Sequence, residues 1–220
     1  MNNFTRFQEP IHSVRPRGER LIEAYSVKLG RRVQCYGELV YQLWILLETN
    51  PEIKLLCERP LFLDGGNGKR VADFWSIRKS SEEFLLINRS THETIAYPPQ
   101  HDIPVRIITL SDLAASRVWI NNWQRLLPLL VTCREHISVS LVRSILKFVK
   151  EPTQLSRIER EFVTGDATLL RAALFQLLHQ GMLKAPSLNV EPLSHRATRP
   201  CLLCCLISKS WRPHLAMYLT

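Results

Sequence analysis

The residues of this sequence best suited to metal-dependent chemistry are two carboxylates, Glu38 and Asp73. Glu38 falls in a segment with helical periodicity, and Asp73 lies near the end of a predicted hairpin strand, in the run Val-Ala-Asp-Phe-Trp. A magnesium-dependent nuclease needs hard carboxylate oxygens to hold the ion beside the scissile phosphate. It usually also needs a lysine, and a lysine two residues from a carboxylate on a strand points to the same face. We therefore take Glu38 and Asp73 as candidate catalytic residues and Mg²⁺ ligands.

Other motifs in the chain give weaker indications of chemistry. The run Gly-Gly-Asn-Gly-Lys at 65–69 lacks the full phosphate-loop spacing and no helix is expected after it, so it predicts a hairpin turn. Serine, histidine and aspartate are scattered, without a glycine-flanked nucleophile. Cys201 and Cys204 have the spacing of half a zinc site, but only His195 and His214 lie nearby in the sequence.

The charge balance makes nucleic acid the first partner to consider. The 220 residues include 29 Lys and Arg against 20 Asp and Glu, a formal net charge of +9, with most of the excess in residues 111–220. Hydrophobic residues are 45% and charged residues 22%, which favours a folded over a disordered chain. No apolar run approaches the roughly 20 residues of a membrane helix, and the N-terminus lacks a signal-peptide core. We therefore expect a cytoplasmic protein with no membrane partner.

The first half of the sequence predicts a polar arm, one helix and a small sheet. Residues 1–32 predict an arm or loop with a short helical turn at 19–26. Leucines recur with helical spacing over 36–49, and Asn50-Pro51 ends this helix. Apolar runs then predict strands at 53–60, 61–64, 69–77, 84–88 and 105–110. The wholly apolar run 84–88 suits the centre of a sheet covered on both faces.

The second half is dominated by helices. Residues 111–135 predict helical or mixed structure, followed by helices at 137–150, 153–163 and 167–182 and two short strands within 183–198. Three helices, a tight turn before the third and then a β-hairpin form the order of a winged helix-turn-helix. Arg171 and Gln176 would then be DNA contacts on the recognition helix. Because that helix carries few side chains that read bases, an interaction-only helical bundle is the alternative.

A series of short motifs runs along roughly residues 28–185 in a recognisable order. They comprise Gly30–Gln34, Leu46–Ile53, Cys57–Pro60, Lys69–Phe74, Phe84–Arg89 and Arg106–Leu113, followed by Asn122, Leu126 and Leu127. In their order and spacing these motifs resemble the TnsA family, the endonuclease subunit of heteromeric transposases, which is related to restriction endonucleases. The resemblance places Asp73 in the family's metal-binding strand.

The family's first helix carries two glutamates that have no counterpart here. Aligned through Leu39 and Glu48, those glutamates fall on Tyr36 and Val40. Glu38 is displaced from both by two residues, which is about 200° around a helix.

The family's other site positions are also changed. Ala72 replaces the proline before Asp73, Ile87 stands where Glu or Gln is expected, and Arg89 stands for the lysine. Arginine keeps the charge but not the compact, pKa-tunable ammonium group. Only Asp73 remains in register, so a magnesium site here is expected to bind metal poorly.

The resemblance implies an α/β protein with a restriction-endonuclease-like N-terminal core and a C-terminal winged-helix-like domain. It implies a role in DNA transposition beside a DDE transposase subunit and an AAA+ ATPase regulator, at the nucleoid when bound to DNA. An active relative would cleave the 5′ strand at double-stranded transposon ends with magnesium. The altered positions predict that this chemistry is weakened or lost and that the chain is a DNA-binding and assembly subunit.

Two alternatives stay open at this point. The first is an active magnesium endonuclease, with Asp73, a relocated Glu38, Glu82 or Glu83, and Arg89 in the lysine role. The second is a winged-helix DNA-binding regulator whose N-terminal domain senses or dimerises.

The expected layout has four parts. Residues 1–27 form a basic arm, 28–134 the nuclease-like domain with a bridging helix, 135–200 the winged-helix-like domain, and 201–220 an apolar tail. Besides Arg171 and Gln176, we take Arg31 and Arg32 as candidate DNA contacts.

Overall fold

The computed structural model describes residues 6–65, 68–89, 102–162, 167–193 and 206–209. The chain divides into two compact units, residues 1–117 and 118–220, and each mixes helices with strands. The segment 111–134, expected to bridge the domains, is divided between them, with 111–117 in the first unit and 118–134 in the second. In the ranges given above, no helix has both the length and the apolar composition needed to cross a membrane.

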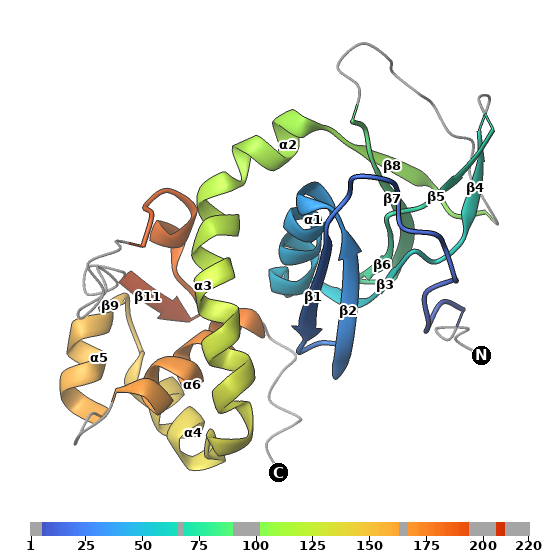
Figure 1. Cartoon of the computed structure of the whole chain (residues 1–220). Helices are drawn as coiled ribbons and strands as arrows, with labels where there is room; N and C mark the ends of the chain where they lie inside the picture. Colours follow the sequence, from blue (N-terminus) through green and yellow to red (C-terminus); the bar gives the residue numbers. More distant parts are fainter. Residues whose placement is uncertain (1–5, 66–67, 90–101, 163–166, 194–205, 210–220) are drawn as a thin grey trace. The chain divides into compact units, whose positions relative to one another are not determined.

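The first unit begins with a β-hairpin that packs against a helix (Figure 1). Strands β1 (Leu21–Ser26) and β2 (Arg31–Tyr36) pair antiparallel, and α1 (Glu38–Thr49) follows. The helical turn expected at 19–26 is therefore wrong. Val33 and Cys35 of β2 are fully buried, and it is pairing with this strand that holds residues 21–26 extended.

A buried carboxylate fastens the hairpin to the helix. Glu48 of α1 accepts hydrogen bonds from the Ser26 hydroxyl at 2.6 Å and from the backbone N–H groups of Val27 and Lys28 at 2.9 and 3.1 Å. The Lys28 ammonium group donates in turn to backbone carbonyls at the end of α1 and beyond it, those of Leu47, Asn50 and Ile53. The hairpin turn thus satisfies carbonyls that a helix end leaves without partners.

The central sheet of the first unit has the strand order β3-β6-β7-β8. Its strands are β3 (Ile53–Glu58), β6 (Phe74–Arg78), β7 (Ser81–Ile87) and β8 (Val105–Ile108). The first three form an antiparallel meander, and β8 joins β7 in parallel. The predicted meander with a further strand is confirmed. So is the central position of the apolar run, since Phe84–Ile87 are all buried.

The strand predicted at 69–77 is divided in two. Its first part is β5 (Gly68–Val71), which pairs with β4 (Phe62–Gly65) in a separate hairpin, and its second part is β6. Ala72 and Asp73 lie between, where the chain changes strand partner. Asp73 is therefore at a junction rather than inside a strand.

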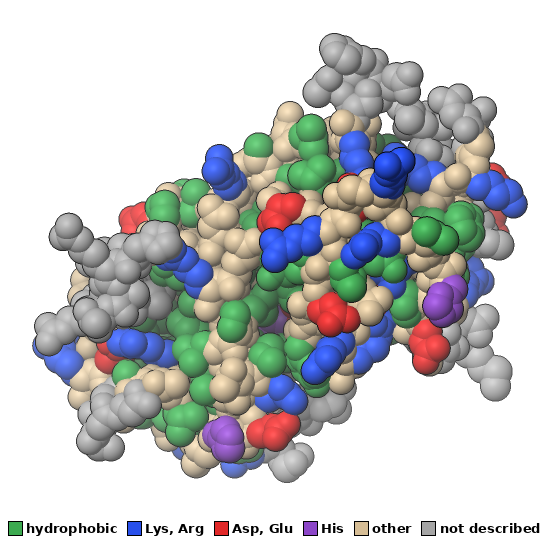
Figure 2. Space-filling model, viewed as in Figure 1, with side chains coloured by type: hydrophobic (Ala, Val, Ile, Leu, Met, Phe, Trp, Pro, Cys, Tyr) green, Lys and Arg blue, Asp and Glu red, His purple; other side chains and the backbone are tan. Residues whose placement is uncertain are grey.

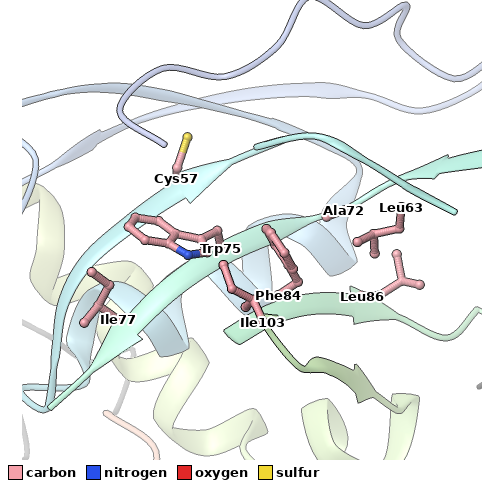
Figure 3. Packing of buried hydrophobic residues seen from close by; sticks show 8 residues of the cluster. All are labelled: Cys57, Leu63, Ala72, Trp75, Ile77, Phe84, Leu86 and Ile103. Atoms are coloured by element: carbon pink, nitrogen blue, oxygen red, sulfur yellow. The ribbon is translucent and has the colours of Figure 1, made fainter. Parts of the chain in front are cut away.

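The core beside this junction is built from side chains of several strands (Figure 3). Trp75 on β6 and Phe84 on β7 are register partners and are at most 1% exposed. Phe7 packs edge-on against both rings, with centroid distances of 5.3 and 5.4 Å. The remaining members of the cluster are Cys57, Leu63, Ala72, Ile77, Leu86 and Ile103. This packing fixes the strands from which the candidate site is built.

A short helix, α2 (Leu110–Ala115), follows β8 and is started by a capping box between Thr109 and Asp112. Hydrogen bonds from the Thr109 backbone N–H and hydroxyl lower the pKa of the Asp112 carboxyl.

In the described part of the second unit, four α-helices are combined with a small sheet (Figure 1). Its helices are α3 (Arg117–Cys133), α4 (Val139–Phe148), α5 (Leu155–Phe162) and α6 (Thr168–His179), with short 3₁₀ turns at Arg134–His136 and Pro186–Asn189. Strands β9 (Thr153–Gln154), β10 (Leu183–Lys184) and β11 (Leu206–Lys209) form an antiparallel sheet in the order β10-β11-β9. The partner of β10 is β11, from the apolar tail, and the described residues 185–193 contain no second strand of the pair expected within 183–198.

A buried asparagine joins α3 to the chain beyond α6. The Asn122 amide donates to the carbonyls of Leu188 and Glu191 at 2.9 and 2.8 Å, and its oxygen accepts from the N–H of Leu193 at 2.8 Å. Asn122, one of the residues on which the TnsA resemblance rests, thus has a structural role here.

Candidate functional site

A cavity of about 310 Å³ opens at the Ala72–Asp73 junction of the first unit. Its walls come from the N-terminal segment, β2, the first turn of α1, the end of β3 and the β4–β5 hairpin, together with Arg89, which lies two residues beyond β7. The polar and charged residues among those that line it are Ser13, Gln34, Tyr36, Glu58, Arg59, Lys69, Arg70, Asp73 and Arg89. Figure 2 shows Lys and Arg side chains spread over the visible face of this unit, with acidic ones among them.

Asp73 is held firmly at the junction. Its Oδ2 accepts a hydrogen bond of 2.7 Å from the backbone N–H of Ile87, and its own backbone N–H and carbonyl are both hydrogen-bonded to neighbouring segments. Burial raises the pKa of the Asp73 carboxyl, against the opposing effects of the Ile87 hydrogen bond and of Arg70 and Arg89. The site therefore favours the neutral acid more than water does.

Arg89 lines the same cavity but pairs with another carboxylate. Its Nη1 lies 2.6 Å from Oε1 of Glu19, in an ion pair that is about one-third exposed on both sides. The Glu19 carboxylate lies against Gly37, where a Cβ would come within 2.1 Å of Oε2. Gly37 also has a φ of +96°, so both space and backbone conformation require glycine there. Glu19 thus reaches the cavity region from the segment before β1.

Two further arginines are fixed by backbone carbonyls. Nη1 of Arg59 donates to the carbonyl of Gln34, and Nη2 of Arg70 donates to the carbonyl of Ile87 at 2.7 Å. The Arg59 guanidinium also lies 4.5 Å from the centroid of the Tyr36 ring. These contacts hold both guanidinium groups in the cavity wall.

The other acidic candidates lie away from Asp73. Glu38 is exposed on α1, outside the cavity lining, and its Oε1 accepts a long hydrogen bond of 3.4 Å from the Gln42 amide. Glu83 accepts from the Ser76 hydroxyl at 3.4 Å, and it lies four residues along β7 from Ile87, roughly 13 Å in an extended strand. Glu82 accepts from the indole N–H of Trp75 at 3.0 Å.

The residues around Asp73 do not fit a magnesium ion. The positions aligned with the family's glutamates, Tyr36 and Val40, both line the cavity, but Val40 has no ligand atom and Tyr36 lies under Arg59. Asp73 itself is flanked by the cations Arg70 and Arg89, which oppose the binding of a metal cation. Within the described ranges, no three or more His, Cys, Asp or Glu side chains are grouped to hold a metal ion.

Glu58 also lines the cavity, but its carboxylate is already paired with an arginine. It is 2% exposed and forms a bidentate pair with Arg31, with two N–O distances of 2.8 Å. This pairing raises the pKa of Arg31 and ties up a side chain expected to contact DNA. Arg32, its neighbour, is exposed on β2, and no described residue pairs with its guanidinium.

The buried thiols of the first unit are poor nucleophiles. Burial raises the pKa of both Cys35 and Cys57 to about 12, so both remain protonated near neutral pH. Cys201 and Cys204 of the possible zinc half-site lie outside the described residues.

The side chains of Arg171 and Gln176 on α6 are not well placed to contact bases in a DNA groove. Nε of Arg171 lies 2.6 Å from Oε1 of Glu159 on α5, in a mostly buried pair. Oε1 of Gln176 is buried without a hydrogen-bond partner among the described residues. Most of the helix is core, including Leu170, Ala172, Ala173, Leu174, Phe175, Leu177 and Leu178.

The second unit has a cleft of its own, of about 540 Å³, between α4 and α5. Three cations line it, Lys147, Lys150 and Arg157, against one acid, Glu151. Phe148 and Phe162 meet there edge to face at 5.4 Å, and Arg157 lies 5.9 Å from the Phe148 ring centroid. A basic cleft with aromatic side chains suits a polyanion.

The structure thus brings Asp73 and Arg89 to one cavity and leaves Glu38 outside it. Sequence reasoning missed Glu19, Arg59 and Arg70, which come from three separate segments. A comparison of the sequence with protein-family models and with curated proteins finds no match.

Proposed function

We propose that this chain is a TnsA-like subunit of a DNA transposition machinery, which binds double-stranded DNA at transposon ends and contacts transposase and ATPase partners. Its 5′-strand cleavage chemistry is weakened or lost. The observation that carries this proposal is the cavity at Asp73, where one retained carboxylate lies among arginines and two aligned glutamate positions are Tyr36 and Val40.

The topology of the first unit supports a nuclease-like origin. A helix, an antiparallel three-stranded meander and a fourth strand parallel to the third follow one another, as α1, β3, β6, β7 and β8. This agrees with the order predicted from the sequence, a helix, then a β-meander, then a further strand, for which we propose a restriction-endonuclease-like core. Asp73 directly precedes β6, the second strand of this meander. Ile87 is the last residue of β7, the third strand, and Arg89 lies two residues beyond it.

The topology of the second unit supports a winged-helix-like domain. The elements run α4, β9, α5, α6, β10 and β11, and β11 pairs with both other strands. The burial of α6 argues against sequence reading by that helix and therefore against a sequence-specific regulator. The basic cleft between α4 and α5 supports contact with the phosphate backbone instead, which positions a protein on DNA without reading bases.

The test is a pair of assays on the full chain. In the first, a fluorescent duplex carrying the terminal sequence of the element that encodes the chain is titrated at several salt concentrations. We expect binding that weakens steeply with salt. In the second, a supercoiled plasmid with both ends is incubated with Mg²⁺ or Mn²⁺, the transposase and the ATPase.

We expect transposition products that depend on the chain and no 5′-strand cleavage that Asp73→Ala removes. Cleavage by the wild type that Asp73→Ala abolishes would show an active nuclease instead. Absence of DNA binding in the first assay would remove the proposal altogether.

A further inference from the structure

We infer that the cavity beside Asp73 is a metal-independent binding site for a phosphate group, contacted by Arg59, Arg70 and Arg89. The inference deepens the proposed function, because it names what a DNA-binding chain would hold at a former nuclease site. Its chemistry can nevertheless be tested without DNA. At about 310 Å³ the cavity is at the small end of ligand pockets, which span roughly 300–1,000 Å³.

The charge of the cavity favours an anion. Its lining includes four cationic side chains, the three arginines and Lys69, against two carboxylates, Glu58 and Asp73. Glu58 is neutralised by its bidentate pair with Arg31, which lies outside the lining. Burial raises the pKa of Asp73 and so weakens the second negative charge. Lys69 lies 3.6 Å from Asp64 in an exposed pair and Arg89 pairs with Glu19, so the excess of positive charge comes mainly from Arg59 and Arg70. This excess attracts phosphate and opposes a divalent cation.

Arg59 supplies an independent indication of a missing partner. It is only 9% exposed, and its Nε is buried without a hydrogen-bond partner among the described residues. Its φ of +46° is unusual for a residue other than glycine, and such backbone strain clusters at binding sites. Buried N–H groups are normally paired, and an anion in the cavity would provide the acceptor that this one lacks.

Arg70 and Arg89 are positioned but not saturated. Among the described residues, each guanidinium has one hydrogen-bonded partner, the Ile87 carbonyl for Arg70 and Glu19 for Arg89. The planar guanidinium has five N–H donors in a fork that matches phosphate oxygens, so donors remain for a ligand. Glu19 then acts as an internal anion that occupies Arg89 when no phosphate is bound. Because this pair is about one-third exposed, exchanging one partner for another costs little.

The first experiment uses inorganic phosphate as the probe, with the full chain in EDTA and ionic strength matched with sodium chloride. We expect phosphate to raise the Tm of the wild type. We expect the phosphate affinity measured by isothermal titration calorimetry to be about tenfold weaker in Arg70→Gln and in Arg89→Gln, as loss of a charge-assisted hydrogen bond predicts. Lys54→Gln is the matched control, an exposed cation on β3 outside the cavity. Equal phosphate binding in all four proteins, or binding that requires Mg²⁺, would overturn the inference.

A second variant tests the sign of the effect. Glu19→Gln frees Arg89, and we expect phosphate to bind about two- to fivefold more tightly, the worth of an exposed ion pair. If Glu19 and Asp73 instead shared a metal, the same variant would weaken binding and only in the presence of Mg²⁺. Circular dichroism of each variant checks that its fold is retained.

A duplex DNA arm separates this inference from the proposed function. Phosphate binding that the arginine variants lose, in a protein that binds no DNA, would leave the cavity assigned and remove the transposition role. If Arg70→Gln and Arg89→Gln leave both DNA binding and phosphate binding unchanged, the cavity is not a phosphate site and the proposed function stands. Weakening of both ligands by the same variants identifies the phosphate as one of the DNA backbone.

Discussion

Oδ2 of Asp73 lies 2.7 Å from the backbone nitrogen of Ile87, whose N–H it accepts. This bond ties the junction between β5 and β6 to the last residue of β7. The carboxylate therefore has a structural task that does not depend on any bound metal. That task gives a reason for a carboxyl group at this position although its neighbours do not suit a magnesium site.

The same bond predicts the effect of neutralising Asp73. An asparagine at this position keeps an oxygen for the Ile87 N–H but carries no charge to bury. We expect Asp73→Asn to raise the Tm by a few degrees at pH 7, because burial favours the neutral acid.

The pH dependence follows from the raised pKa of Asp73. The favourable contribution of the neutral acid is complete below the unfolded pKa of about 3.9 and is lost as the pH rises through the higher folded pKa. The difference between wild type and Asp73→Asn should thus be largest near neutrality and vanish below about pH 4. Thermal unfolding at both pH values checks this, and a variant that is less stable at pH 7 would contradict it.

The Arg31–Glu58 pair, with a buried carboxylate and a guanidinium that is 30% exposed, predicts a clear loss of stability. Glu58→Gln leaves the Arg31 guanidinium without its bidentate carboxylate, and the loss of hydrogen bonds to a charged group costs roughly 1.5–3 kcal/mol. Glu135→Gln is the control, since it breaks a pair whose carboxylate is 76% exposed and should change stability by less than about 1 kcal/mol. Urea unfolding of both variants compares the two losses, and equal midpoints would refute the difference.

The second unit offers a matched pair on one helix. Asn122→Ala removes hydrogen bonds to two carbonyls and one N–H, and we expect it to lower the free energy of unfolding by about 3 kcal/mol. Asn121→Ala changes an exposed side chain next to it and should have almost no effect. Chemical unfolding followed by circular dichroism measures both, and similar losses in the two variants would argue against the role of Asn122.

The cleft between α4 and α5 predicts how DNA binding depends on salt. Replacing both Lys147 and Arg157 with glutamine removes two of its three cations. We expect weaker DNA binding and a decrease of about two in the slope of log K against log salt. Lys184→Gln, a cation on β10 outside the cleft, is the control. A slope that is the same in all proteins would place the DNA elsewhere.

Where apolar periodicity is strong, the fold could be predicted from the sequence. The leucine spacing and Asn50-Pro51 correctly indicated α1, and the apolar run Phe84–Ile87 correctly indicated a central strand. The hairpin β1–β2 was missed because its strands are only partly buried and one begins with two arginines. Its extended form depends on pairing and on Glu48, which lies 20 or more residues away in the sequence.

The candidate site was predictable only where a local motif marked it. Asp73 and Arg89 fall in recognisable strand contexts and line one cavity. Arg59 and Arg70 fall inside motif segments and Glu19 does not, but no local pattern marks the three as site residues, because their proximity arises from the packing of segments far apart in sequence. Glu38 shows the opposite case, a carboxylate in an attractive context that the helix turns toward solvent.

Strand β11 has a consequence for the order in which the chain acquires its structure during synthesis. It is the middle strand of its sheet, and its partners β9 and β10 precede it by many residues. A ribosome must therefore translate residues 206–209 before β9 and β10 can be joined. The first unit, whose described strands all lie before residue 109, can fold while the second still waits for its last strand.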